Sequence, residues 1–275
     1  MYKADMHTHS NASFDGYSTT AELAAAAIER GLSALCVTDH CECNDFIERG
    51  HLPPEIHYYH KELAESNFAS AKEAAKGRIK LLYGIEIAQA HERPEIYEKI
   101  LAENSFDFII ASIHNLRGMT DFAFMDNFES VENCNRLLKK YMEELYETAQ
   151  LRDYDTFAHI GYPLRYMHYR QGYDVSLKSF VPELSDILRT LIEKGCALEL
   201  NISGLRSAHR STFPDIDVLR LYKSLGGELV TVGTDAHRAS DIGSCIDDGY
   251  KLLSEAGFKY HTVFENRKPT LHTID

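Results

Sequence analysis

Two histidines separated by a single residue follow the first apolar run of the chain. His7 and His9 lie on either side of Thr8 at the end of a predicted strand over 3–7. Alternate side chains of an extended strand point to the same side, so both imidazoles can reach one cation. Near the other end of the sequence, an apolar run over 229–234 leads into Asp235-Ala236-His237. Both patterns indicate metal binding.

Further metal-binding side chains follow the apolar runs between these two patterns. They are Asp39 and His40 after 34–38, Glu86 after 81–85, His114 after 108–113, and His159 after 156–158. A lone histidine at a strand end is more often a hydrogen-bonded structural residue. Six histidines and three carboxylates at consecutive strand ends instead predict a multinuclear metal site.

Strand and helix patterns alternate along the whole sequence. The predicted strands cover 3–7, 34–38, 80–87, 108–113, 156–160, 197–202 and 229–234, with a further short one over 260–263. The predicted helices run from the Thr19 capping box to Arg30, over about twenty residues between Pro53-Pro54 and Gly77, over 94–104, 131–150 and 179–194, from Pro214 to Gly226, and over 246–256. Near-continuous apolar strands between amphipathic helices predict a parallel sheet covered by helices.

Every candidate ligand follows the carboxyl end of its strand. In a parallel barrel those ends converge on one face, where active sites form. An open doubly wound sheet also places ligands at carboxyl ends, but it gathers them from fewer strands. Ligands from at least six strands favour a closed or nearly closed barrel. No linker, low-complexity tract or repeat divides the chain, so a single domain over 1–275 is expected.

Composition and charge narrow the functional classes. The 275 residues are 44% hydrophobic, enough for a large single core. No apolar run approaches the roughly 18 residues of a membrane span, and no secretion signal precedes the first strand, so we expect a cytoplasmic protein with no membrane partner. The six cysteines are scattered along the sequence, so we expect them to be reduced thiols. A net charge of −13 argues against nucleic acid as a partner and favours a compact substrate. The oligomeric state stays open.

The order of these motifs resembles the polymerase and histidinol phosphatase (PHP) superfamily. The resemblance runs from residue 5 to about 240 and rests on His7-Thr8-His9-Ser10, Asp15-Gly16, Thr38-Asp39-His40, Gly84-Ile85-Glu86, Ser112-Ile113-His114, His159 and Asp235-Ala236-His237. It implies a distorted (β/α)7 TIM-like barrel. It also implies a trinuclear metal centre that hydrolyses phosphate esters.

The resemblance assigns the candidate ligands to three metal positions. The first set is His7, His9, Glu86 and Asp235, the second is Glu86, His114 and His159 with Glu86 as the bridge, and the third is Asp15, His40 and His237. Imidazole and carboxylate ligands without thiolate suit three divalent Zn, Fe or Mn ions. Many family members carry histidine where this chain has Asp15, and an oxygen ligand there favours Mn or Fe over Zn.

Two of the aspartates near the predicted strand ends have an alternative interpretation. Asp15 precedes Gly16, and Asp-Gly is also an ordinary turn pair. Asp39 could orient an imidazole from behind or cap a turn.

Two arginines bear on the substrate. Arg165, six residues after His159, and Arg206, within 199–206, resemble the basic residues of histidinol-phosphate phosphatases at these positions. Because a guanidinium matches phosphate oxygens bidentately, the pair is expected to bind a terminal phosphate. Glu199 is one candidate for binding the amino or imidazole group of histidinol. Arg117 departs from the more apolar residues of the family in its loop, so the partners of the non-phosphate half stay open.

Together with the metal-ligand pattern, the resemblance implies a metal-dependent phosphomonoesterase acting on a small phosphate monoester, with L-histidinol phosphate as the expected substrate. Glu86, Asp235 and His237 are the expected catalytic residues. Three alternatives remain. A PHP phosphoesterase for another small phosphate or a nucleotide would share all the ligands. An amidohydrolase also starts with His-x-His, but the late Asp-x-His and Thr38-Asp39-His40 argue against it. A non-catalytic metal or phosphate sensor is disfavoured by the intact ligand set.

Overall fold

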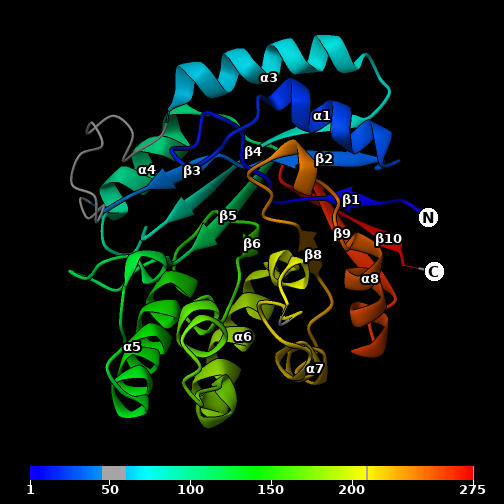
Figure 1. Cartoon of the computed structure of the whole chain (residues 1–275). Helices are drawn as coiled ribbons and strands as arrows, with labels where there is room; N and C mark the ends of the chain where they lie inside the picture. The colour runs from blue at the N-terminus through cyan, green and yellow to red at the C-terminus, as the bar shows by residue number, and fades with distance from the viewer. Residues whose placement is uncertain (45–59, 209, 275) are drawn as a thin grey trace.

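Parallel strands, each followed by a helix, form the body of the molecule (Figure 1). A computed structural model describes residues 1–44, 60–208 and 210–274. The main sheet runs in the order β1-β2-β4-β5-β6-β7-β8, and every neighbouring pair is parallel. The strands are β1 (Ala4–Asp5), β2 (Ala34–Val37), β4 (Lys80–Ala88), β5 (Phe108–Ser112), β6 (Thr156–Phe157), β7 (Ala197–Asn201) and β8 (Val230–Gly233).

Backbone hydrogen bonds between the two ends of this order close the sheet into a barrel. The Met6 amide donates to the Val232 carbonyl at 2.9 Å. One step farther along, the amide of Asp235 donates to the His7 carbonyl at 2.8 Å. An isolated parallel bridge joins Thr8 to Ala236. The contacts that close the barrel therefore also set the His7–His9 segment beside the Asp235–His237 segment.

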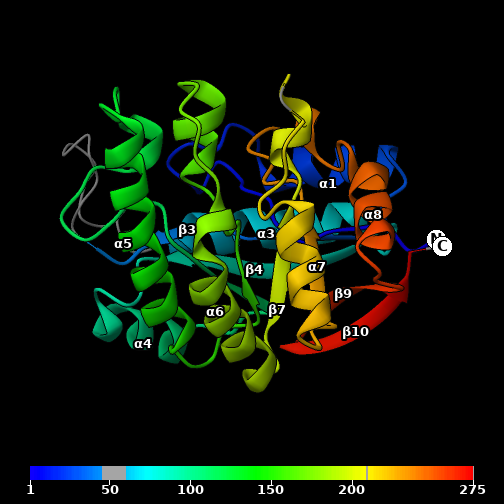
Figure 2. The ribbon, with the colours of Figure 1, turned by 90° about the horizontal axis from the view of Figure 1, so that it is seen from below.

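Helices cover the outside of the barrel. They are α1 (Thr20–Glu29), α3 (Lys61–Ala75), α4 (Pro94–Glu103), α5 (Val131–Ala149), α6 (Val181–Lys194), α7 (Ile216–Ser224) and α8 (Ile246–Glu255). The predicted capping box forms at α1, where the Thr19 side chain accepts from the Glu22 amide and the Glu22 carboxylate accepts from the Thr19 amide. Figure 2 shows α5, α6, α7 and α8 side by side along one flank.

Apolar side chains fill two separate regions. The larger core lies between the strands and the surrounding helices. A smaller cluster joins strand residues such as Met6 and Phe108 to Val263 and Phe264 of a carboxyl-terminal hairpin. This hairpin consists of β9 (Tyr260–Glu265) and β10 (Lys268–Thr273), which pair antiparallel. It packs at the amino ends of the strands, opposite the predicted site, and both chain termini lie near it (Figures 1 and 2).

The distorted TIM-like barrel predicted from the sequence is confirmed, with local differences. Residues 40–42, expected in a loop, form β3 (His40–Glu42), which pairs with β4. Three residues with two polar side chains are too short to show a strand periodicity. A π-helical segment, η2 (Arg165–Arg170), was likewise not predicted. The predicted helix before Gly77 is observed from Lys61; its expected start at 53–59 lies outside the described residues. Across the described ranges, none of the helices combines the length and hydropathy needed to cross a membrane.

Candidate metal centre

All nine predicted ligands lie at the carboxyl end of the barrel. His7 and His9 follow β1, Glu86 lies within β4, and His40 starts β3. The others come from the segments after β1, β5, β6 and β8: Asp15, His114, His159, Asp235 and His237. His9 and Glu86 are completely buried, whereas the Asp15 side chain is 42% exposed. The cluster is thus a buried group of donors with Asp15 at its rim.

Glu86 lies at the centre of the histidines. Its Oε2 is 3.4 Å from His7 Nε2, 3.7 Å from His9 Nε2 and 2.8 Å from His40 Nδ1. Its Oε1 is 3.2 Å from His114 Nε2 and 2.9 Å from His159 Nε2. The two carboxylate oxygens therefore face different histidines, as a bridging ligand requires.

The two aspartates face the other side of the histidine cluster. Asp235 Oδ1 lies 3.4 Å from His9 Nε2 and 3.7 Å from His237 Nδ1. Asp15 places one oxygen 3.5 Å from His40 Nε2 and the other 3.2 Å from His237 Nε2. His40 thus contacts both the Glu86 group and the Asp15 group.

Four overlapping groups of the cluster have donor atoms within 4.8 Å of one another. They are His7 with His9 and Asp235, Glu86 with His114 and His159, His9 with His40 and His237, and His40 with Glu42 and His114. The first two correspond to two of the predicted sets. In the third, His9 stands where the prediction has Asp15, because Asp15 approaches His40 and His237 from the rim.

The donors in this cluster fit divalent cations. Several buried atoms have no hydrogen-bond partner among the described residues although they face each other: His7 Nε2, His9 Nε2, His40 Nδ1, Glu86 Oε2 and Asp15 Oδ1. Buried polar atoms without partners cost free energy, so such an arrangement is unfavourable unless a ligand satisfies it. Imidazole nitrogens and carboxylate oxygens converging in this way suit Zn, Fe or Mn.

The charges within the cluster are strongly coupled. Burial opposes ionisation of Glu86, but the facing histidines, led by His7 and His114, hold the pKa of its carboxyl well below the usual value. Burial together with the neighbouring His40 and His237 lowers the pKa of His9 well below its ordinary range. His9 is therefore the neutral imidazole that metal binding needs, whereas the facing carboxylates raise the pKa of His7, His40 and His114, so a bound cation would replace protons on these rings.

Two glutamates hold ligand imidazoles from behind. His7 Nδ1 is hydrogen-bonded to Glu199 Oε1 at 2.5 Å, and Glu199 Oε2 accepts from the His159 amide at 2.8 Å. His114 Nδ1 is hydrogen-bonded to Glu42 Oε1 at 2.9 Å. Such contacts fix the ring so that Nε2 faces the centre. Glu199, considered above as a candidate for binding histidinol, is buried and both of its oxygens contact other residues, which argues against that role.

Asp39 acts on the backbone after His9 rather than directly on an imidazole. Its Oδ1 accepts from the Ser10 amide at 2.7 Å and from the Ser13 hydroxyl at 2.8 Å. Ser13 Oγ in turn lies 3.4 Å from His9 Nδ1. Both earlier interpretations of Asp39 thus hold in part, since it shapes a turn and reaches an imidazole through Ser13.

Two supporting residues had no signal in the sequence analysis. Asp5 accepts from the Thr234 amide at 2.9 Å and the Gly243 amide at 3.0 Å, which ties β1 to the segment that carries Asp235. Asn201 Nδ2 donates to Asp235 Oδ2 at 3.3 Å. Their partners are distant in sequence, so only the apolar context of Asp5 in β1 and the place of Asn201 at the end of β7 could have suggested them.

The backbone of two ligands is held in an uncommon conformation. His159 has a backbone φ of 27° and Asp235 a φ of 53°, values that residues other than glycine rarely adopt. Each such residue costs about 1–3 kcal/mol and persists only where its surroundings enforce it. Glu199 contacts the His159 amide and Asn201 the Asp235 carboxylate, so the contacts to β7 help to hold both.

A cavity of about 540 Å³ opens above the cluster. Its wall includes His114, His159, Asp235 and His237 from the cluster, together with Arg165 and Asp121. The aromatic residues of the wall are Phe14, Tyr17, Phe124, Tyr162 and Tyr166. The wall of the cavity therefore combines the metal-binding donors with the cationic side chain of Arg165 and with an aromatic lining.

The two predicted phosphate-binding arginines occupy different places. Arg165 lies in the cavity wall, donates to the Ser203 hydroxyl, and has its Nη2 3.7 Å from Asp235 Oδ2. Arg206 lines an adjoining hollow that also contains Arg165. Its Nη1 donates to the Thr234 carbonyl at 2.6 Å and its Nη2 to the Asp235 carbonyl at 3.4 Å. Arg117 lies at the surface, 3.0 Å from Glu147.

A second histidine–carboxylate group lies away from the cavity, formed by His91, Glu92 and Glu144. Both ring nitrogens of His91 have partners, Glu144 Oε2 at 3.1 Å and Thr148 Oγ1 at 2.9 Å. Glu144 also accepts from the Arg117 amide. The group therefore ties α5 to two loops and is structural.

A parallel barrel with a histidine–carboxylate cluster at its carboxyl face defines a class of metal-dependent barrel proteins. Residues 5–203 match the family model of the PHP domain, and the chain belongs to this family.

Relatives and a solved structure extend the match over nearly the whole chain. The histidinol-phosphatase of Lactococcus lactis is 29% identical over 277 residues, covering 98% of this chain and 96% of that protein. A probable histidinol-phosphatase of Thermotoga maritima is 27% identical, with 94% of each chain covered. The crystal structure of the Lactococcus lactis histidinol phosphate phosphatase, complexed with zinc, L-histidinol and phosphate, superposes with a TM-score of 0.79 at 26% identity and covers 98% of both chains.

Proposed function

We propose that this protein is a metal-dependent phosphomonoesterase that hydrolyses L-histidinol phosphate to L-histidinol and phosphate in histidine biosynthesis. The observation that carries the proposal is the histidine cluster around Glu86 beneath a cavity whose wall includes Arg165. The likeness along 98% of both chains to a phosphatase complexed with zinc, L-histidinol and phosphate supports this substrate.

Three divalent transition-metal ions, Zn, Fe or Mn, are the cofactors of this proposal. Their ligands would be His7, His9, Glu86 and Asp235 for the first, Glu86, His114 and His159 for the second, and Asp15, His40 and His237 for the third. Bound ions of this kind lower the pKa of water and neutralise charge on phosphoryl oxygens.

The side chains of the protein supply position and charge. Glu86, Asp235 and His237 are the proposed catalytic residues, and the contacts of Glu199 and Glu42 keep His7 and His114 aimed at the centre. Arg165, which lies in the cavity wall, would bind phosphate oxygens. Arg206 would assist from the adjoining hollow with the N–H groups that do not hold the backbone carbonyls of Thr234 and Asp235.

The test is a screen of phosphate release by the metal-replete protein. Substrates are L-histidinol phosphate, small sugar and amino-alcohol phosphates, and nucleoside monophosphates. We expect the highest kcat/KM for L-histidinol phosphate. Hydrolysis of another ester with a higher kcat/KM would reassign the substrate within the same chemistry. No phosphate release from any of these esters would overturn the phosphatase proposal.

The alternative is a PHP phosphoesterase for another small phosphate ester or a nucleotide. It uses the same histidines and carboxylates and differs only in what the upper wall of the cavity binds. The cavity of about 540 Å³ accepts several small organic phosphates, so the screen distinguishes the two possibilities.

A further inference from the structure

The upper wall of the cavity contains an aspartate that the metal cluster does not use. Asp121 lies in the loop between β5 and α5, seven residues after His114, and lines the cavity together with Tyr162 and Tyr166. The other carboxylates of the cavity wall are Asp15 and Asp235, and both face imidazoles of the cluster. Asp121 instead hydrogen-bonds to a phenol and a backbone amide, so no imidazole of the cluster is hydrogen-bonded to its carboxylate among the described residues.

Local hydrogen bonds hold the Asp121 carboxylate in place. Asp121 caps the short helix η1 (Phe122–Phe124), and its Oδ1 accepts from the Ala123 amide at 2.7 Å. The same oxygen accepts from the Tyr162 hydroxyl at 3.1 Å, which in turn accepts from the Tyr166 hydroxyl at 3.0 Å. Both bonds among the described residues use Oδ1, so Oδ2 is left for a ligand.

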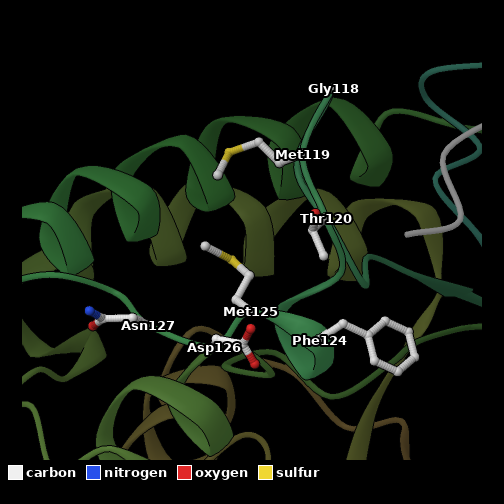
Figure 3. Close-up of a pocket in the computed structure, with 7 residues that line it drawn as sticks. All are labelled: Gly118, Met119, Thr120, Phe124, Met125, Asp126 and Asn127. Carbon is white, nitrogen blue, oxygen red and sulfur yellow. The ribbon is translucent and has the colours of Figure 1, made fainter. Parts of the chain in front are cut away.

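The loop that carries Asp121 is braced by the segment around η2. Arg170 donates to the carbonyls of Ala123 and Met125 at 2.9 and 2.7 Å, and Gln171 donates to the Asp126 carbonyl at 2.9 Å. Figure 3 shows the neighbouring residues 118–120 and 124–127 of this loop around a second hollow. A carboxylate fixed in this way needs little reorganisation to bind a cation.

The cavity wall carries charges of both signs, a pattern complementary to one type of substrate. Arg165 supplies positive charge for phosphate, with its Cζ 5.6 Å from the centroid of the Tyr162 ring, whereas Asp121 supplies negative charge at the hydroxyl of the same tyrosine. Aromatic rings attract organic cations, and a neighbouring carboxylate can accept a charge-assisted hydrogen bond from such a cation. An ammonium group on the alcohol half of a phosphate monoester would match the part of the wall that holds Asp121.

We propose that Asp121, flanked by Tyr162 and Tyr166, binds the ammonium group of the substrate and selects phosphate monoesters of amino alcohols. This inference rests on the proposed phosphomonoesterase function and identifies the residue that recognises the non-phosphate half. Asp121 is a binding residue, and its removal acts through the charge of the substrate rather than through the phosphate.

The experiment compares matched pairs of esters with and without an amino group. The pairs are L-histidinol phosphate with its desamino analogue, and O-phosphoethanolamine with ethyl phosphate. The measured quantity is the ratio of kcat/KM within each pair for the wild type, Asp121→Asn, Asp121→Glu and the control Asp126→Asn. Asp126 is an exposed aspartate of the same loop, so the control makes the same charge change elsewhere.

We expect the ratio to favour the amino ester in the wild type and to fall by roughly 10- to 100-fold in Asp121→Asn. Asp121→Glu should recover part of the ratio, and Asp126→Asn should retain it. Metal content and thermal unfolding show whether each variant is folded. An equal loss on both members of a pair, or an unchanged ratio in Asp121→Asn, would overturn the inference.

The same data separate this inference from the proposed substrate. A wild type that prefers O-phosphoethanolamine to L-histidinol phosphate, with a ratio that collapses in Asp121→Asn, supports the inference and refutes the proposed substrate. Rapid hydrolysis of L-histidinol phosphate with no dependence on Asp121 supports the substrate and refutes the inference.

Discussion

At the scale of single residues, Glu86 brings one carboxylate within 3.7 Å of five imidazoles. Each oxygen of Glu86 faces a different subset of these histidines. No single histidine of the cluster therefore has a role equivalent to that of Glu86. Removing the charge of Glu86 would leave several buried cationic or metal-bound groups without their common counter-charge.

Glu86→Gln should therefore lower both metal content and turnover. The side chain keeps its size but loses the negative charge, and we expect kcat to fall by on the order of 100-fold or more. Elemental analysis and steady-state hydrolysis of L-histidinol phosphate measure the two effects. Glu92→Gln, which removes a carboxylate outside the cluster, is the control. A fully active, fully metallated Glu86→Gln protein would show that the bridge is misassigned.

The two arginines should respond differently to removal. Arg165→Ala takes away a guanidinium of the cavity wall, so metal content should stay intact while kcat/KM falls by roughly 10- to 1000-fold. Arg165→Lys should restore only part of the lost kcat/KM, because an ammonium lacks the planar, two-pronged geometry of the guanidinium.

Arg206→Ala also releases the backbone carbonyls of Thr234 and Asp235, so it should weaken metal retention as well as activity. Arg117→Ala, at a surface ion pair, is the control for both arginines. Near-wild-type kcat/KM in both alanine variants would mean that the phosphate is bound elsewhere.

The sequence locates the candidate ligands of the cluster better than the residues that support them. His7, His9, Glu86 and Asp235 stand at strand ends, where a period-two pattern and an apolar run reveal their direction. Glu42 and Asp5 act through histidine or backbone partners that are distant in sequence, and no local pattern encodes such a contact. The different positions of Arg165 and Arg206 likewise depend on how two loops fold over the barrel.

At the scale of elements, the barrel strands were predictable and the short additions were not. Apolar runs bounded by turns located β2, β4, β5 and β7 to within one or two residues. β3 is too short for a periodicity, and η2 has a π-helical geometry that no spacing signals. Both lie beside the cavity, where the contacts of the site override local propensity.

The hairpin β9–β10 closes the amino end of the barrel and buries a histidine. His261 is fully buried, and its Nε2 donates to the Tyr2 carbonyl at 2.9 Å. Burial lowers the pKa of His261 from 6.5 to about 4. Below pH 6.5 the unfolded chain binds a proton that the folded protein excludes until about pH 4, so His261 reduces stability as the pH falls through this window.

His261→Gln should flatten this part of the pH dependence. Between pH 7 and pH 5 the wild type should lose about 2 kcal/mol more unfolding free energy than the variant. Denaturant unfolding at several pH values measures the difference. His60→Gln, which replaces an exposed histidine before α3, should follow the wild type. If His261→Gln and the wild type lose stability in parallel, His261 is protonated in the folded state.

At the scale of the whole molecule, the metal-binding cluster and the closure of the barrel are built from the same contacts. The hydrogen bonds that join β1 to β8 involve the backbone of His7, His9 and Asp235. Stability of the barrel and occupancy of the cluster should therefore be linked. The chain also carries a net charge of −13, so bound divalent cations reduce its overall self-repulsion.

Metal removal should accordingly destabilise the entire fold. A site filled at 1,000 times its dissociation constant adds about 4 kcal/mol to the unfolding free energy, equivalent to a rise in Tm on the order of 10 °C for a chain of this size. We expect protein purified without chelator to contain about three Zn, Fe or Mn ions per chain, and chelation to lower Tm by at least this amount. Re-addition of zinc should restore Tm, whereas magnesium, which prefers oxygen ligands in an octahedral site, should restore little. Elemental analysis and calorimetric unfolding test both parts. Recovery of one ion or none, with a Tm that does not respond to zinc, would refute the trinuclear assignment and the link between the cluster and barrel closure together.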